Sequence, residues 1–419
     1  MSGPRPQTEF DNERLRLGAG ASRLYVVLSA IAVACLIGGA AAAGFSSHPL
    51  KRFLHAYLVN WGYVLSIGLG CLLFVMVQHL VRAGWSVSVR RIAETLAGTL
   101  PLAALLAMPL VLPVLMHRGD LFPWAGHGEH GGAHHGPEMS AGKQAYLSGS
   151  FWTARVVVCL VVVATLAWWY RRASVRQDQQ QDIAPTRSME RRSALGILVA
   201  FLALTLLSFD MLMSLDPHWY STIFGVYYFS GAAVAAFAAI ILCVFGLQRA
   251  GYMTVSITRE HYHDLGKFLF GFTFFWGYIA FSQYMLLWYA NIPETTGWLV
   301  RRGASTVAEN MNGWTVVGVL LLVGHLLIPF GALLPRTVKR RPGLLAFWAA
   351  WLLVFHWIDL WWLVMPQLDG RVYLGLPELL TFAGLFAALA AAALRLAMRH
   401  SLRPMHDPRL EESLVYVNA

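Results

Sequence analysis

The chain has 419 residues, of which 57% are hydrophobic and only 13% are charged. Soluble globular proteins carry roughly 25% charged residues, so this composition excludes a soluble domain and indicates a protein that lives in lipid. The formal net charge of +10 could suit a nucleic-acid-binding protein, but the positions of the basic residues favour another explanation.

Apolar runs long enough to cross a hydrocarbon core of roughly 30 Å recur along the whole chain. They are continuous rather than alternating, which excludes a closed barrel and predicts an all-α, polytopic membrane protein. Ten spans are predicted, at approximately Ala21–Gly44, Phe53–Val81, Ile92–Met116, Phe151–Tyr170, Ser193–Leu215, Ser221–Leu247, Leu265–Asn291, Trp314–Leu334, Leu344–Met365 and Tyr373–Met398.

Lysine and arginine gather in alternate segments between the spans, which is the pattern that the positive-inside rule describes for cytoplasmic loops. Segment 171–192 holds six arginines, and segment 336–341 is also basic. We therefore predict that both termini are cytoplasmic, and that the first span is a retained helix, since no convincing A-x-A cleavage site is present. The predicted organisation is a cytoplasmic segment 1–20, a membrane domain 21–398 and a cytoplasmic tail 399–419.

The four cysteines are scattered through the spans and form neither a C-x-x-C-H motif nor an iron–sulfur pattern. We therefore expect no covalently bound cofactor and no redox centre on this chain. A glycine-rich outer loop carries four histidines that could bind a metal, but its glycine content predicts no ordered scaffold, so no metal site is assigned. These histidines are His127, His130, His134 and His135.

Spans five and nine share an ungapped pattern: an Arg-Arg pair, an aspartate eighteen residues after its second arginine, and a proline seven residues further on. The landmarks are Arg192, Asp210 and Pro217 in one span, and Arg341, Asp359 and Pro366 in the other. The repeat predicts two four-helix bundles of the same orientation, spans two to five (about 53–215) and six to nine (about 221–366), with two flanking helices. Eighteen residues rise about 27 Å, which places both aspartates near the outer edge of the hydrocarbon.

Placing an ionisable residue inside a membrane span costs free energy, and such residues usually face the interior of a helix bundle. Because buried carboxylates and histidines can exchange protons near neutral pH, one interpretation is a proton path. Its candidates, from the inner mouth through a central step to the outer exit, are His79, Glu94, Asp264, His325, Tyr284, His356, Asp359 and Asp210. The alternative is that these groups only hydrogen-bond neighbouring helices together.

A second interpretation is a quinol site at the outer edge, since a quinol must lose two protons as its electrons leave. The candidates for that site combine a proton acceptor with aromatic walls: Asp210, His356, Trp357 and Trp361. Tryptophans at span ends are also ordinary interfacial anchors, and that alternative stays open.

Two stretches carry a family resemblance: SLDPHWYSTIFGVYYFSG (Ser214–Gly231) and HDLGKFLFGFTFFWGYIAFSQYMLLWYANIPE (His263–Glu294). They resemble the F subunits of alternative complex III, a branch of the NrfD-like, or polysulfide-reductase membrane-anchor, superfamily. The likeness runs over nearly the whole chain, and FSQYMLLWYANIPE is its most specific motif.

The resemblance implies an integral subunit of a quinol:cytochrome c, or other quinol:acceptor, oxidoreductase in the respiratory or photosynthetic chain of a bacterial inner membrane. Its implied partners are a homologous NrfD-like subunit, periplasmic iron–sulfur and multihaem cytochrome c subunits, and a quinone such as menaquinone. The resemblance attributes quinol oxidation to the homologous subunit and a proton-conducting route to this one. That role is carried over to Asp210, His325, His356 and Asp359.

Two other functions remain open at this point. One is a directly quinol-binding catalytic subunit, as in polysulfide reductase, and the other is a stand-alone proton-coupled transporter. Transporters often combine broken helices with inverted repeats, whereas the repeat found here is parallel. We therefore prefer a scaffold and proton-path subunit that is not catalytic by itself.

Overall fold

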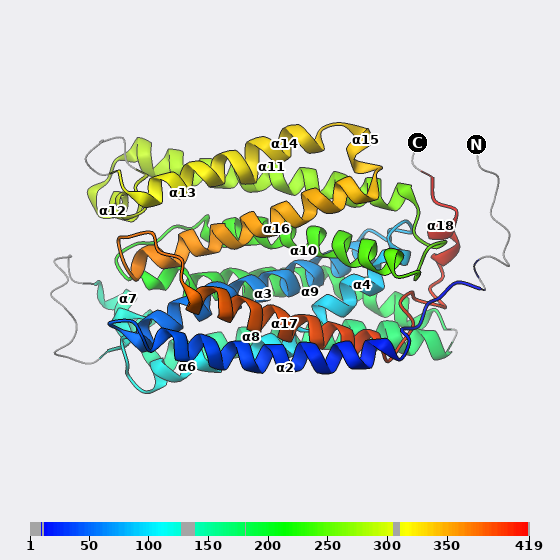
Figure 1. Cartoon of the computed structure of the whole chain (residues 1–419), viewed down its shortest axis with the longest axis horizontal. Coiled ribbons are helices and arrows are strands. Elements are labelled where there is room, and N and C mark those ends of the chain that lie inside the picture. Colours follow the sequence, from blue (N-terminus) through cyan, green and yellow to red (C-terminus); the bar gives the residue numbers. More distant parts are fainter. Residues whose placement is uncertain (1–9, 11, 127–138, 181, 305–310, 418–419) are drawn as a thin grey trace.

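The computed structural model describes residues 10, 12–126, 139–180, 182–304 and 311–417. Within these residues the chain is all-α and contains no strand. Ten helical spans in this described part are long and apolar enough to cross a membrane, and they lie side by side along one direction (Figure 1). The predicted fold class is therefore confirmed. The four histidines of the glycine-rich loop fall in 127–138, outside the described residues.

The ten spans are formed by α2 (Gly20–Ala43), α3 (Pro49–Leu80), the series α4 (Val87–Ala97), α5 (Leu100–Leu105) and α6 (Met108–Leu115), α8 (Gly149–Gln180), α9 (Ala184–Met211), α10 (Phe224–Arg249), α11 (Arg259–Ala290), the series α13 (Gly313–Leu321), η4 (Leu322–Leu327) and α14 (Ile328–Leu333), α16 (Pro342–Val364) and α17 (Leu376–Ala397). The shorter elements are η1 (Pro123–Ala125), α7 (Ala141–Tyr146), η2 (Met213–Leu215), α12 (Pro293–Arg301), α15 (Arg336–Lys339), η5 (Met365–Gln367) and α18 (Leu410–Leu414).

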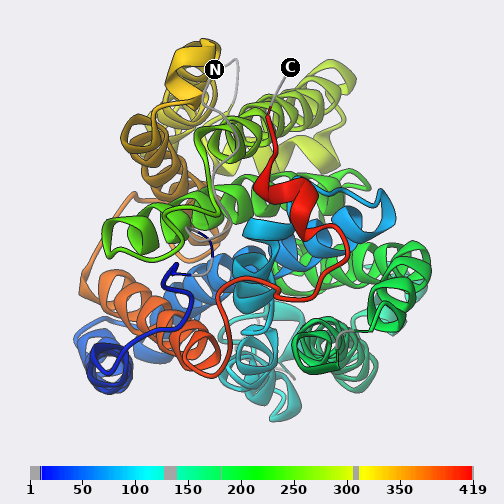
Figure 2. The same cartoon turned by 90° about the vertical axis from the view of Figure 1, so that its right-hand side faces the viewer.

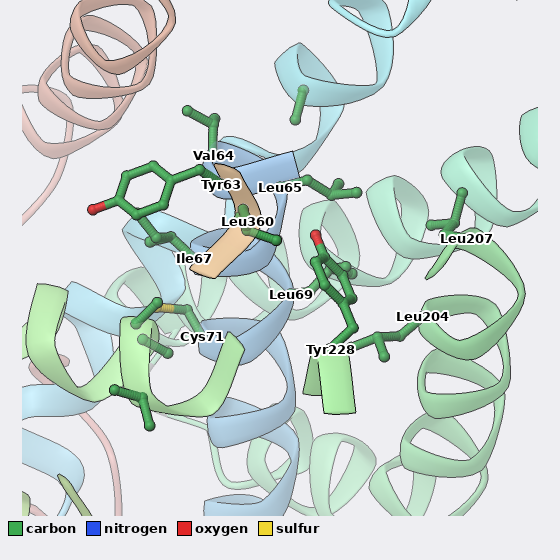
Figure 3. Close-up of a cluster of buried hydrophobic side chains, with 14 of the residues drawn as sticks. Tyr63, Val64, Leu65, Ile67, Leu69, Cys71, Leu204, Leu207, Tyr228 and Leu360 are labelled. Atoms are coloured by element: carbon green, nitrogen blue, oxygen red, sulfur yellow. The ribbon is translucent and has the colours of Figure 1, made fainter. Parts of the chain in front are cut away.

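Helix α3 is the centre of the molecule. Its apolar window is wholly buried inside the protein, and α4, α9, α10, α16 and α17 all pack against it. Figure 3 shows part of this core, where Leu69 of α3 lies near Tyr228 of α10 and Leu204 of α9. A span that touches no lipid must find every packing and hydrogen-bonding partner among its neighbouring helices.

We group the helices by the two predicted bundles, and this division stays a prediction. The first consists of α3, α4–α6, α8 and α9, and the second of α10, α11, α13–α14 and α16. The bundles meet along α3 and α10. The sequence did not predict that the two flanking helices, α2 and α17, would pack along each other on one side of α3, as Figure 2 shows.

The third span is broken into three helical segments, and its prolines explain the breaks. A proline has no N–H, and its ring clashes with the carbonyl four residues earlier. Helix α4 ends at Ala97, four residues before Pro101, and α5 ends at Leu105, four residues before Pro109. The apolar run in the sequence predicts this span but not its interruption.

The tail that follows α17 returns across one end of the bundles and closes it. Figure 2 views this end, with α18 lying over the helix ends. Asp407 of the tail pairs with the buried Arg90, and Arg403 pairs with Glu13 at 3.2 Å. One ion pair therefore holds the tail to α4, and the other holds the tail to the segment before α2. Both segments lie at the same end of the molecule.

We predict that Gly70→Ala separates the two bundles and lowers stability. A Cβ at Gly70 of α3 would collide with the backbone carbonyl of Ala232 in α10, which cannot rotate away. Overpacking of this kind costs roughly 1–3 kcal/mol. Thermal unfolding of the detergent-solubilised chain measures the change. Gly246→Ala in α10 is the matched control, because nothing lies within 4 Å of its Cβ position. Equal unfolding temperatures for the two variants would contradict the prediction.

Candidate functional site

Asp359 is the centre of the candidate site in the second bundle. It lies in α16 and is 1% exposed. The hydroxyl of Tyr227, from α10, donates to its Oδ1, and the indole Nε1 of Trp276, from α11, donates to its Oδ2 at 3.1 Å. No cation of the described residues pairs with this carboxyl group. A carboxyl group held only by neutral donors can gain or lose a proton without breaking an ion pair.

His325 lies directly beside this group. Its ring centroid is 3.8 Å from that of Trp276, and its side chain is fully buried. Neither of its ring nitrogens has a hydrogen-bond partner in the described structure. A buried polar group without a partner calls for an explanation, and a functional role is one of them, so His325 stays a candidate for the proton path.

The backbone around His325 is also irregular. Residues Leu322–Leu327 form a π-helical turn in the middle of the eighth span. Pro329 lies four residues after His325, so its ring would clash with the His325 carbonyl in a regular α-helix. A π-helical turn widens the helix at that point, and such turns occur frequently at functional sites.

His356 connects the two bundles. Its Nε2 lies 2.9 Å from the hydroxyl of Ser66 in α3, and that hydroxyl donates to the carbonyl of Tyr63. If the Ser66 hydroxyl donates to Tyr63, Nε2 of His356 carries the imidazole proton and Nδ1 is an acceptor. Nδ1 has no hydrogen-bond partner among the described residues and faces Gly231, where a Cβ would strike the ring.

The two aspartates related by the repeat have different surroundings. The guanidinium of Arg155, from α8, donates to both carboxylate oxygens of Asp210 at 2.7 Å, and both side chains are largely buried. Arg155 also donates to the carbonyl of Tyr146. This ion pair joins α8 to α9, and it favours the structural interpretation for Asp210. Within the described part of the chain, Asp359 has no such cation.

A cavity of about 410 Å³ lies next to the donors of Asp359, between α11, α12 and α13. Tyr227 and Trp276 form part of its wall, and so does Tyr284 of the predicted proton path. Its size is typical of a ligand site. Within the described part of the chain, this cavity is lined by none of the residues predicted for a quinol site, Asp210, His356, Trp357 and Trp361. Trp357 instead donates to Asn60 at 2.6 Å.

The three residues predicted for the inner mouth have separate surroundings near the tail. Glu94 pairs with Arg91 at 3.0 Å, within an ion cluster. Asp264 accepts a hydrogen bond from the hydroxyl of Tyr416. His79 is buried, and neither of its ring nitrogens has a hydrogen-bond partner in the described residues. Their role as a proton entry stays a prediction.

Three residues that contact the two aspartates were not predicted from the sequence: Arg155, Tyr227 and Trp276. Arg155 is itself an ionisable residue inside a predicted span, and that alone could have suggested it as the partner of an intramembrane aspartate. Pro329 was a signal for the irregular turn at His325. No signal pointed to Tyr227 and Trp276 as the donors to Asp359, because buried aromatic residues are common in every span.

Comparison of the chain with protein-family models and with curated proteins found no match. Within the described residues, no three His, Cys, Asp or Glu side chains are placed as the ligands of a metal ion would be. The fold therefore defines only the class of protein. This is an all-α, multi-pass integral membrane protein with ten spans in its described part.

We predict that Arg155→Leu destabilises the protein by about 3–5 kcal/mol, because it leaves the Asp210 carboxylate buried without its cation. Adding Asp210→Asn should restore most of that loss, since it removes the uncompensated charge. Chemical unfolding in mild detergent measures both variants. Arg118→Leu is the control, because its pairing with Asp120 is exposed and should contribute no more than about 1 kcal/mol. A double variant as unstable as Arg155→Leu alone would count against the ion pair.

Proposed function

We propose that the chain is an integral subunit of a quinol:electron-acceptor oxidoreductase in a bacterial inner membrane, where it supplies the helical scaffold and a route for protons. Its partners would be a homologous membrane subunit and periplasmic iron–sulfur and multihaem cytochrome c subunits, which carry the electrons. Both of its termini would be cytoplasmic. The family resemblance of Ser214–Gly231 and His263–Glu294 suggests the complex.

The observation that carries the proton role is the group around Asp359. A carboxyl group with neutral donors, a histidine without partners and a second histidine at the bundle interface occur together in one bundle. Each of these groups can hold a proton, and Trp276 lies between Asp359 and His325. Groups of this kind inside a membrane are typical of proton relays.

The cavity also helps to choose between this role and direct quinol oxidation. A quinol-oxidising site needs a carboxylate or an imidazole against the ring to accept its protons. The described residues that line the cavity include neither, and Asp359 lies behind Tyr227 and Trp276. This arrangement favours a scaffold and proton subunit over a quinol-oxidising one.

The assembly is tested by purifying the tagged chain from its native membrane in a gentle detergent. We expect it to bring down subunits with a haem c absorption spectrum and quinol:cytochrome c reductase activity. Recovery of a stable chain by itself, active in proton-coupled uptake of a solute in proteoliposomes, would overturn the proposal.

The proton role is tested by Asp359→Asn in the purified complex. Asparagine retains an oxygen acceptor for one of the two donors, Tyr227 and Trp276, but cannot take up a proton. Proton uptake coupled to turnover should therefore fall about tenfold or more while electron transfer changes much less. His325→Ala should act in the same direction. Stopped-flow measurement with a pH dye in proteoliposomes reports both rates.

Asp359→Glu is the matched control for this experiment, because it keeps an ionisable group and should retain most of the coupled uptake. Unchanged uptake and turnover in both Asp359→Asn and His325→Ala would refute the relay. Loss of the assembled complex in both variants would instead indicate that these residues are structural.

A further inference from the structure

The cavity beside Asp359 contains one unusual wall residue. Among the described residues that line it, Arg302 is the only charged one, and most of the others are aromatic or aliphatic. Arg302 follows α12 in the connection between the seventh and eighth spans, and it is only 2% exposed. A buried cation in the wall of an apolar cavity needs a source of negative charge.

The contacts of Arg302 supply hydrogen bonds but no counter-ion. Its Nη1 donates to the carbonyl of Trp298 at 3.2 Å, and its Nη2 donates to the carbonyl of Leu363 at 2.5 Å. The guanidinium carbon lies 3.7 Å from the centroid of the Trp298 ring. Its Nε has no partner, and no carboxylate of the described residues forms an ion pair with it.

The guanidinium nevertheless stays charged. Burial, with a further contribution from the neighbouring Arg301, lowers the pKa of Arg302 to about 9. The carboxylate of Asp216 acts in the opposite direction, but it forms its ion pair with Arg301. At neutral pH it therefore carries a full positive charge. The carbonyls of Trp298 and Leu363 lie in the last turns of α12 and α16, where helix dipoles provide roughly half a negative charge each. These partial negative charges stabilise the buried guanidinium, and they still allow an anion to pair with it.

The cavity is open toward the lipid. Four of its lining residues on α11 and α13 with η4 are substantially exposed on the flank of the protein: Phe281, Tyr284, Val319 and Leu322. On a membrane span, an exposed apolar flank faces acyl chains. The cavity thus joins a cation near the end of the bundle to an apolar opening that runs toward its middle.

We propose that this cavity binds a membrane phospholipid with an anionic headgroup, whose phosphate pairs with Arg302 and whose acyl chain leaves between α11 and α13. The connection between two spans places Arg302 near headgroup level. An arginine at this level can pair with the phosphate of a lipid headgroup, because a guanidinium and a phosphate form charge-assisted hydrogen bonds. The bound lipid would cover the wall formed by Tyr227 and Trp276, and so shield Asp359 from other access on this side.

The test is native mass spectrometry of the full chain, delipidated in detergent and titrated with phosphatidylglycerol or phosphatidylcholine. We expect phosphatidylglycerol to bind at least about tenfold more tightly, and Arg302→Gln to remove that preference, since a hydrogen bond to a charged group is lost. Arg118→Gln is the matched control, because it removes an exposed arginine that already pairs with Asp120.

A second variant keeps Arg302 intact, in case Arg302→Gln fails to fold. Gly318 lines the cavity, and a Cβ there meets only Trp362, at an ordinary 3.8 Å. Gly318→Leu should therefore fill the cavity and weaken phosphatidylglycerol binding about tenfold without moving the cation. Equal binding of the two lipids, an unchanged phosphatidylglycerol affinity in Gly318→Leu, or displacement of phosphatidylglycerol by a short-chain menaquinone would overturn the proposal.

Discussion

The burial of α3 on all sides is the constraint on which the rest of the structure depends. Lipid does not reach the buried window of this helix, so several of its polar groups find their partners on neighbouring helices. Asn60 shows how this is done: its amide nitrogen donates to Thr381 at 2.7 Å, and its oxygen accepts from Trp357. Ser66 contacts His356 in the same way. The polar residues of one helix thus set the positions of α16 and α17.

The same constraint explains why the two bundles differ at equivalent positions. A carboxylate inside a protein can be stabilised by a cation or by neutral donors, and the chain uses both solutions. Arg155 neutralises Asp210 and makes a rigid link between α8 and α9. Tyr227 and Trp276 hold Asp359 with hydrogen bonds alone. The two aspartates that the sequence repeat relates therefore differ in their partners, since only one of them is paired with a cation within the described residues.

The group around Asp359 and the cavity that is proposed to bind a lipid share a wall. This shared wall connects the two proposals physically. Trp276 contacts His325 with one face of its ring, donates to Asp359, and lines the cavity. An occupant of the cavity would exclude water from that wall and strengthen the electrostatic interactions behind it. The lipid would then belong to the environment of Asp359 and His325, the two residues proposed to carry protons.

The sequence by itself determined the all-α class, the approximate positions of the ten spans and the equivalence of Asp210 and Asp359. Hydropathy and residue spacing are local properties, so these features needed no knowledge of neighbours. Only the tertiary structure decided which groups meet: Arg155 with Asp210, the aromatic donors with Asp359, and α2 with α17. Many helix pairings satisfy the same apolar pattern, and the choice between them depends on small residues and polar partners contributed by distant spans. Pro329 is a sequence signal for the irregular turn at His325. The surrounding bundle, in contrast, is what holds the His325 ring against Trp276.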